Sequence, residues 1–72
     1  MQNFSFSKYQ SGGYSLTTRD GHAARIICTD ALGPKPIVAL ISADGMETAY
    51  QYDLGGQRYY LADNRLDLFL TK

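Results

Sequence analysis

The sequence has few of the residues on which several common functions depend. It contains one cysteine, Cys28, which excludes an internal disulfide and a zinc site built from cysteines. It contains one histidine, His22, and no tryptophan. No apolar run approaches the ~20 residues of a membrane-spanning helix, so we expect no membrane segment. The amino terminus lacks the basic start and the apolar run of a signal peptide, so we expect a cytoplasmic protein.

The charges of the chain cancel. Seven lysines and arginines balance seven aspartates and glutamates, and the formal net charge is zero. This balance removes the broad attraction that drives non-specific binding to nucleic acid or anionic membranes. It also weakens the repulsion between copies of the chain, which permits self-association. The length of 72 residues and the apolar content of 44% suit one small domain that spans residues 1–72.

Three turns that end in glycine, at residues 19–21, 43–45 and 54–56, divide most of the chain into strand-like segments. A type I turn followed by a left-handed glycine closes a three-residue hairpin loop, and a two-residue Asp-Gly turn is the alternative at the first two sites. At the first turn, a three-residue loop sets Leu16 opposite Ala24 and keeps the apolar side chains on one face. At the second turn the sequence does not decide between a two-residue and a three-residue loop, because the preceding strand is apolar on both faces.

The third turn predicts one more hairpin. A three-residue loop at 54–56 sets Tyr52 opposite Arg58 and Tyr50 opposite Tyr60. The second strand of this hairpin would then occupy the residues that follow the loop.

The last segment of the chain also predicts a strand. Leu66, Leu68 and Leu70 recur with a period of two, as in a strand with one buried face. A helix that begins after Asp63 or Asn64 is the alternative. Together the segments predict an all-β fold, a small antiparallel meander of five to six strands, most simply an SH3-like or similar small barrel.

Residues 1–13 precede the predicted meander and form a short helix or an ordered arm. Ser5 or Ser7 suits the amino-terminal cap of a helical turn, and the glycines at 12 and 13 would end it. This segment has three aromatic side chains to bury: Phe4, Phe6 and Tyr9.

The run TRDGHAARIICTD, the later PIVALI and the closing DLF at residues 67–69 form a pattern. It resembles small uncharacterised proteins of Bacteroides-type gut bacteria and of their phages and mobile elements. The resemblance covers residues 17–69 and is strongest up to Ile41. It implies no established activity. A phage or mobile-element setting would suit a small accessory or regulatory protein better than a metabolic enzyme.

No arrangement of residues predicts catalysis, a cofactor or a metal. A Cys28–His22 pair would need hydrogen-bond contact, but six residues along one strand separate the two backbones by about 20 Å. We therefore expect Cys28 to be buried and inert. His22 and Asp20 would need distant carboxylates to hold a metal, and aspartate before glycine is common in turns. We expect a protein that is not an enzyme.

Tyrosine is the abundant residue with functional potential. The chain has six tyrosines, and Tyr50, Tyr52 and Tyr60 fall with Arg58 on one side of the last predicted hairpin. These four residues are the predicted partner-binding site. Such rings anchor protein partners or stack on the bases of single-stranded nucleic acid. They also stabilise sheets through cross-strand pairs, which is the alternative without a function.

Strand parity supports a surface site. Ile37, Ala39 and Ile41 share one parity and suit the interior, while the tyrosines share the parity of Val38 and would lie outside. The aromatic side chains of residues 1–13 would cover part of this outer face, and a protein the rest. We therefore expect Tyr52→Ala to remove binding with little effect on stability.

The predicted function is a non-catalytic protein-interaction or accessory module whose partner is a second copy of the chain or a host or phage protein. A weakly binding, single-stranded nucleic-acid-binding barrel is the alternative, disfavoured by the zero net charge. Basic side chains gathered on the tyrosine face would favour nucleic acid. An aliphatic face poor in charge would favour a protein.

Overall fold

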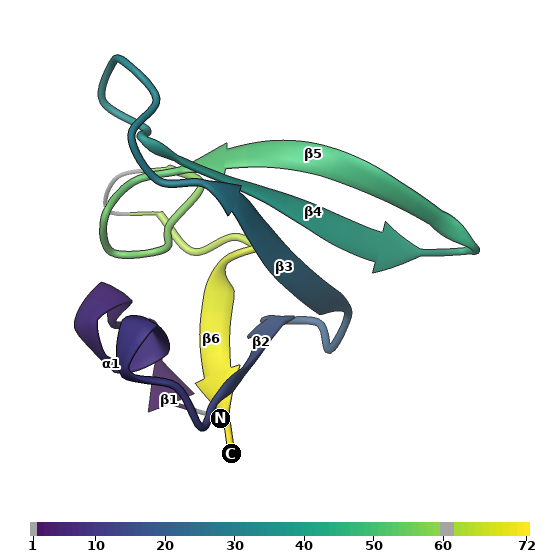
Figure 1. The fold of residues 1–72 in the computed structure, drawn as a ribbon. Helices are drawn as coiled ribbons and strands as arrows, with labels where there is room; N and C mark the ends of the chain where they lie inside the picture. Colours follow the sequence, from purple (N-terminus) through teal and green to yellow (C-terminus); the bar gives the residue numbers. More distant parts are fainter. Residues whose placement is uncertain (1, 60–61) are drawn as a thin grey trace.

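The computed structural model describes residues 2–59 and 62–72, which form one antiparallel sheet and one short helix (Figure 1). The order of the strands in the sheet is β1-β6-β2-β3-β4-β5, and each neighbouring pair is antiparallel. The predicted all-β class, the small meander and the short amino-terminal helix are confirmed. The elements are β1 (Gln2–Asn3), α1 (Phe6–Ser11), β2 (Ser15–Thr18), β3 (Ala23–Cys28), β4 (Ile37–Ala43), β5 (Met46–Tyr52) and β6 (Leu68–Thr71).

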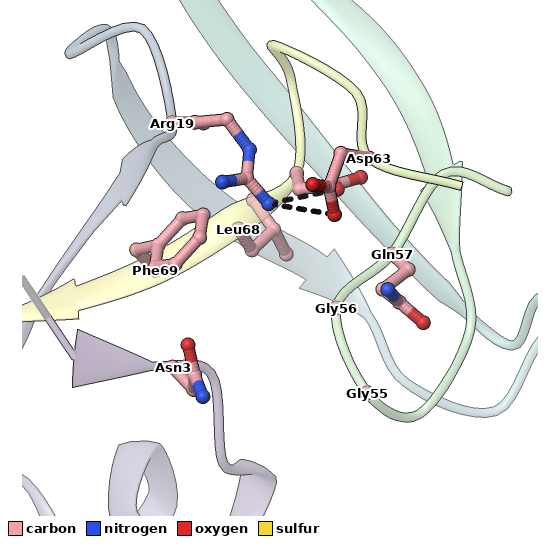
Figure 2. Close-up of a pocket in the computed structure, with 9 residues that line it drawn as sticks. Asn3, Arg19, Gly55, Gly56, Gln57, Asp63, Leu68 and Phe69 are labelled. Atoms are coloured by element: carbon pink, nitrogen blue, oxygen red, sulfur yellow. Dashed lines mark hydrogen bonds and ion pairs between the residues drawn. The ribbon is translucent and has the colours of Figure 1, made fainter. Parts of the chain in front are cut away.

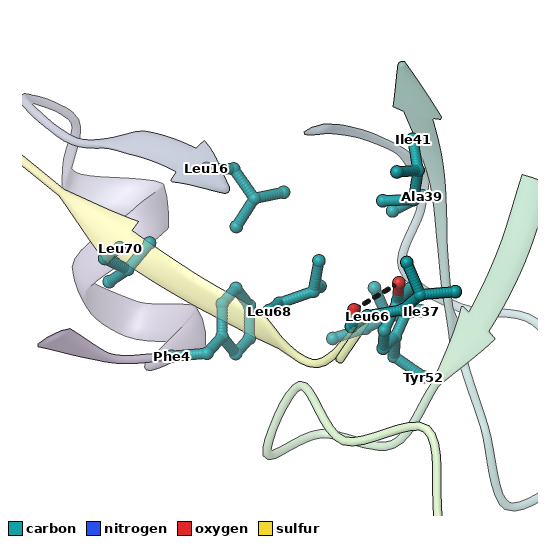
Figure 3. Packing of buried hydrophobic residues seen from close by; sticks show 9 residues of the cluster. All are labelled: Phe4, Leu16, Ile37, Ala39, Ile41, Tyr52, Leu66, Leu68 and Leu70. Carbon is teal, nitrogen blue, oxygen red and sulfur yellow. Dashed lines mark hydrogen bonds between the residues drawn. The ribbon is translucent and has the colours of Figure 1, made fainter. Parts of the chain in front are cut away.

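The sheet bends so that its two halves face each other across one core (Figure 3). Side chains from β2 and β6 meet side chains from β4 and β5, and the predicted interior set of β4 is buried as expected. Burial of apolar surface in this cluster is the main term that stabilises the fold. The buried apolar residues are Phe4, Leu16, Ile37, Ala39, Ile41, Tyr52, Leu66, Leu68 and Leu70.

Two hydrogen bonds tie β5 and the loop after it to β6 and the segment before it. The Tyr52 hydroxyl donates to the Leu66 carbonyl at 2.7 Å, and the Leu68 N–H donates to the Gly56 carbonyl at 2.8 Å. Within the two described ranges, no strand ladder joins β5 to β1 or β6. Closure into a barrel, and with it the SH3-like assignment, therefore stays a prediction.

The three-residue loops predicted at 19–21 and 54–56 are confirmed. In each loop the residue before it donates its N–H to the carbonyl of the residue after it, at 2.9 Å and 3.0 Å respectively. The third loop residues, Gly21 and Gly56, have φ of 90° and 77°. Only glycine adopts this left-handed conformation without strain.

The turn between β4 and β5 has two residues, and its length reverses the predicted faces of β5. Both loop residues, at 44–45, have positive φ, as a type I′ turn requires. The resulting register sets Tyr52 opposite Ile37 and Tyr50 opposite Ala39, so both tyrosines share the core face. The prediction that they lie outside is wrong. A loop one residue shorter moves every side chain of the following strand to the other face.

The chain after the 54–56 loop does not return as the predicted strand in the part that the structure describes. Arg58 donates its backbone N–H to Oδ1 of Asp67 at 2.9 Å, so the predicted pair between Tyr52 and Arg58 does not form. Tyr60, the predicted partner of Tyr50, lies outside the described residues. The sheet still has six strands, because β1 pairs with the outer side of β6.

A β-bulge in β3 moves Cys28 off the core face. Ile26 pairs with Ala39 and Cys28 with Val38, so Ile27 is an extra residue in β3. Cys28 is only half-buried, and its thiol lies 3.4 Å from Oδ1 of Asp30. The prediction of a buried Cys28 on the core face is wrong, because the bulge shifts the alternation by one residue.

The amino-terminal segment docks on its own sheet. The Ser5 hydroxyl caps α1 by accepting a backbone N–H of the first turn at 3.4 Å, and Gly12 ends the helix with φ of 89°. Phe4 is buried in the core, where Phe6 and Tyr9 pack against the same cluster. The segment thus covers the core itself and not an outer face of the sheet.

Candidate functional site

The structure separates the four predicted partner-binding residues. Tyr52 is 0% exposed, so its ring is not available to a partner. Tyr50 and Arg58 are half-buried and reach the surface. Tyr60 lies outside the described residues. Tyr50 and Arg58 are therefore the two predicted residues that the structure brings together as candidates.

The environment of Tyr52 explains why it belongs to the core. Burial raises the pKa of the Tyr52 phenol far above its ordinary value, which keeps the hydroxyl protonated. The protonated hydroxyl donates to the Leu66 carbonyl at 2.7 Å (Figure 3). This bond satisfies a buried polar group on each side, so Tyr52 fastens the segment before β6 to β5.

Arg58 and Lys35 lie over tyrosine rings at one end of the sheet. The Arg58 guanidinium carbon is 4.5 Å from the ring centroid of Tyr50 and 5.5 Å from that of Tyr59. Lys35 Nζ is 4.7 Å from the Tyr59 centroid. These distances are within the range of cation–π attraction. We call these four residues the cation–tyrosine cluster.

Three segments that are distant in the sequence build this cluster. Lys35 comes from the loop between β3 and β4, Tyr50 from β5, and Arg58 and Tyr59 from the chain after the 54–56 loop. Both loops lie beyond the same end of the sheet (Figure 1). Sequence reasoning missed Lys35 and Tyr59, and the position of Tyr59 next to Arg58 is the one signal that could have added it.

Neither cation of the cluster forms an ion pair with a carboxylate of the described residues. Across residues 2–59 and 62–72, the ion pairs involve Arg19, His22, Arg25 and Arg65, and none involves Lys35 or Arg58. Nε of Arg58 is buried and has no hydrogen-bond partner among these residues. Tyr59 is 50% exposed. The cluster therefore combines accessible aromatic surface with uncompensated positive charge.

A groove of about 340 Å³ beside Arg19 is an alternative candidate site (Figure 2). One guanidinium nitrogen of Arg19 lies 3.3 Å from Asp63 and 3.5 Å from Asp67, and the guanidinium stacks over Phe69 at 4.8 Å. The charge of Arg19 is thus balanced within the protein. Asp67, 2% exposed, also accepts the backbone N–H of Asn64 at 3.0 Å, so this network organises the loop before β6.

The polar group around Asp20 has the residue types of a catalytic triad, but their order in space differs from that of a triad. The Thr18 hydroxyl donates to Oδ1 of Asp20, and His22 Nδ1 lies 3.0 Å from the same oxygen. The carboxylate therefore separates the hydroxyl from the imidazole, whereas activation of a nucleophile requires the imidazole beside it. Thr18 is also 0% exposed. These three residues form a structural group and no activated nucleophile.

The electrostatics of Asp20 agree with this structural role. The Thr18 hydroxyl, followed by His22 and Arg65, lowers the pKa of Asp20 to about 2, against the opposing effect of burial. Arg65 Nη1 reaches Oδ2 of Asp20 at 3.2 Å. Both carboxylate oxygens are thus occupied by partners within the protein.

The part of the chain that the structure describes holds no group of three or more histidine, cysteine, aspartate or glutamate side chains placed to bind a metal. No helix of this part is long and apolar enough to cross a membrane. No family model, no curated protein and no solved structure matches the chain. The fold and the site thus define a small antiparallel β domain with a cation–tyrosine cluster at one end of its sheet.

Proposed function

We propose that this chain is a non-catalytic binding domain that takes single-stranded nucleic acid at the cation–tyrosine cluster. The observation that carries the proposal is the position of Lys35 and Arg58 on tyrosine rings, with no carboxylate paired to either cation in the described chain. Aromatic rings stack on bases of any sequence, and cations beside them contact the phosphates.

This proposal reverses the order of the two functions that the sequence suggested. Basic side chains on the tyrosine face favour nucleic acid, and an aliphatic face poor in charge favours a protein partner. Two of the four cluster residues are basic and none is aliphatic. An accessory role in a phage or mobile element is kept as a proposal on the resemblance alone.

Tyr59 supplies the ring surface in the proposed complex. Its side chain is half exposed, and Lys35 covers one part of the ring at 4.7 Å. A base takes the place of the flexible lysine on the ring, and the ammonium group turns to the adjacent phosphate. Arg58 lies over two rings and stays in place, where its guanidinium contacts a second phosphate.

The zero net charge makes the proposed binding weak and local. Two cations that each neutralise one phosphate give a slope of log K against log salt of about −1.4, from about −0.7 for each contact with a single strand. Binding is therefore expected at low salt and falls as salt rises. Duplex DNA lacks free bases for stacking and is expected to bind less well.

The test is fluorescence anisotropy with labelled oligothymidylate and oligouridylate at low salt. Lys35→Gln and Arg58→Gln each remove one positive charge from the cluster and are expected to weaken binding and to flatten the salt slope by about 0.7. Tyr59→Ala is expected to weaken binding by about 5- to 150-fold, the loss of one stacked base at about 1–3 kcal/mol. Circular dichroism and thermal melting establish that each variant is folded.

Lys72→Gln is the matched control. Lys72 also lies over a tyrosine, with its Nζ 5.3 Å from the ring centroid of Tyr14, and its replacement changes the net charge by the same amount. We expect it to bind like the parent chain. The proposal fails if the cluster variants and Lys72→Gln lose affinity equally, or if no variant and no parent protein binds either oligonucleotide. Capture of a protein that depends on Tyr59 and Arg58, without oligonucleotide binding, would restore the protein partner.

A further inference from the structure

The two edges of the sheet differ in how they are protected. β1, at one edge, has two residues and is followed closely by α1. β5, at the other edge, has seven residues, contains no lysine, arginine or proline, and pairs with β4 without a register shift. No ladder or backbone bond covers its free side in the chain as described. Natural sheets commonly block such an edge with charge, proline or a bulge. β5 has neither proline nor bulge, and its one charged residue, Glu47, is paired with Arg25 of β3.

The turn before β5 determines which backbone groups face outward. The residues that flank a two-residue hairpin loop form a hydrogen-bonded pair, and bonded and non-bonded pairs alternate from there. Residues 46, 48, 50 and 52 therefore bond to β4. Glu47, Ala49 and Gln51 direct their N–H and C=O groups away from β4, toward the free edge.

We propose that β5 pairs in an antiparallel manner with β5 of a second copy of this chain, centred on Ala49. In this register Ala49 faces its own counterpart and Glu47 faces Gln51 of the other copy. The outward groups then form about six backbone hydrogen bonds, and the two sheets become one continuous sheet.

The side chains of β5 fit this pairing. Glu47 is the only charged residue of the strand, and it meets a neutral glutamine, so no like charges lie opposite each other. Thr48 meets Tyr50 of the other copy, a favourable pair of a β-branched and an aromatic side chain. The small side chain of Ala49 leaves the centre of the interface open. The zero net charge of the chain adds no general repulsion.

The contact is smaller than a standard protein interface, so the dimer is expected to dissociate on dilution. One pair of strands buries less than the ~1,600 Å² of a typical stable complex. Sedimentation equilibrium between about 10 µM and about 1 mM spans the dissociation constants expected for such a contact. We expect the average mass to rise from one copy toward two within this range.

Two substitutions of one exposed residue test the register. Gln51→Glu places a carboxylate opposite Glu47 on both sides of the dimer and is expected to weaken association several-fold. Gln51→Lys places an ammonium group there and is expected to strengthen it.

Ala49→Pro removes an outward N–H at a position where an edge strand tolerates proline, and it is expected to leave a folded monomer.

Amide hydrogen exchange gives an independent readout. With rising concentration, the amides of Glu47, Ala49 and Gln51 are expected to become protected, whereas those of Thr48 and Tyr50 are protected at every concentration. A mass of one copy at about 1 mM overturns the proposal, and pairing with a strand of another protein then becomes the alternative. Equal effects of the two Gln51 variants, or protection without dependence on concentration, also overturn it.

Discussion

At position 52 the chain needs a phenol as well as a ring. The Tyr52 side chain is completely buried, and its hydroxyl donates to the Leu66 carbonyl at 2.7 Å. Replacement by phenylalanine keeps the ring but leaves that carbonyl without its donor in a dry environment. The hydroxyl therefore contributes to stability although it is not accessible to a partner.

We predict that Tyr52→Phe destabilises the domain by about 1–2 kcal/mol, the cost of an unpaired buried acceptor. Tyr52→Ala adds a cavity and should cost about 3–5 kcal/mol. Urea denaturation measures both. Tyr59→Phe, at a ring that is half exposed, is the control and is expected to change the unfolding free energy by less than about 0.5 kcal/mol. Equal stability of Tyr52→Phe and the parent chain would contradict the role assigned to the hydroxyl.

The same residue shows where prediction of the site from the sequence stops. Tyr50 and Arg58 were predicted to share a surface, and they do lie in contact. Tyr52 does not share that surface, because its face depends on the length of the turn at 44–45, and a preceding strand that is apolar on both faces does not reveal this length. Lys35 was missed because a contact between two loops leaves no periodic pattern in the sequence.

At the scale of elements, Asp20 joins the β2–β3 hairpin to the segment before β6. Its carboxylate binds the Thr18 hydroxyl and His22 within the hairpin. It also binds Arg65, which lies in the segment before β6. Its backbone N–H also donates to the Arg65 carbonyl at 3.0 Å. The loop at 19–21 is thus a docking element as well as a turn.

The pH dependence of stability should report this junction. The folded pKa of Asp20 is about 2, below the ordinary value of 3.8, so the unfolded chain binds more protons between these values. The contribution of Asp20 is complete above about pH 4 and is lost as the pH falls toward 2. We predict that Asp20→Asn lowers stability at pH 7 and that the difference from the parent chain shrinks as the pH falls through this window. Urea denaturation at a series of pH values measures it, and parallel curves would contradict it.

Local patterns predicted most elements of the fold. The cap at Ser5, the three-residue loops and the period of two in the last strand lead directly to α1, the first hairpin and β6. The strand expected after the 54–56 loop is absent from the described chain, because Asp67 takes the backbone N–H of Arg58. Nothing in the alternation of leucines marks Asp67 as a buried acceptor, and β1 is too short to have a periodic pattern.

At the scale of the whole molecule, Gly56 and Phe4 connect the amino-terminal segment to the loop after β5. A Cβ atom on Gly56 would lie 2.7 Å from Cβ of Phe4 and 2.8 Å from its Cγ. The Phe4 ring is part of the core, so moving it away from Gly56 would disrupt core packing and cost free energy. The sequence identified the left-handed glycine, but the contact between segments so far apart could not be predicted from local chemistry.

Gly21 offers a matched comparison for the last prediction. Both glycines have positive φ, but a Cβ on Gly21 would meet nothing within 4 Å. We predict that Gly21→Ala costs about 1 kcal/mol through left-handed strain alone. Gly56→Ala should cost about 1–3 kcal/mol more, because it also overpacks the contact with Phe4. Thermal and urea denaturation of the two variants measure the difference.

The location of the additional strain separates this explanation from a general weakening of the loop. Gly56→Ala pushes against Phe4, which follows β1, so the amides that β1 and β6 share should exchange faster with solvent in this variant. Gly21→Ala should leave their exchange relative to the rest of the sheet unchanged. Equal costs at the two glycines, with equal protection of β1, would mean that the amino-terminal segment yields to the added methyl group without loss and that its contact with Gly56 contributes little to the fold.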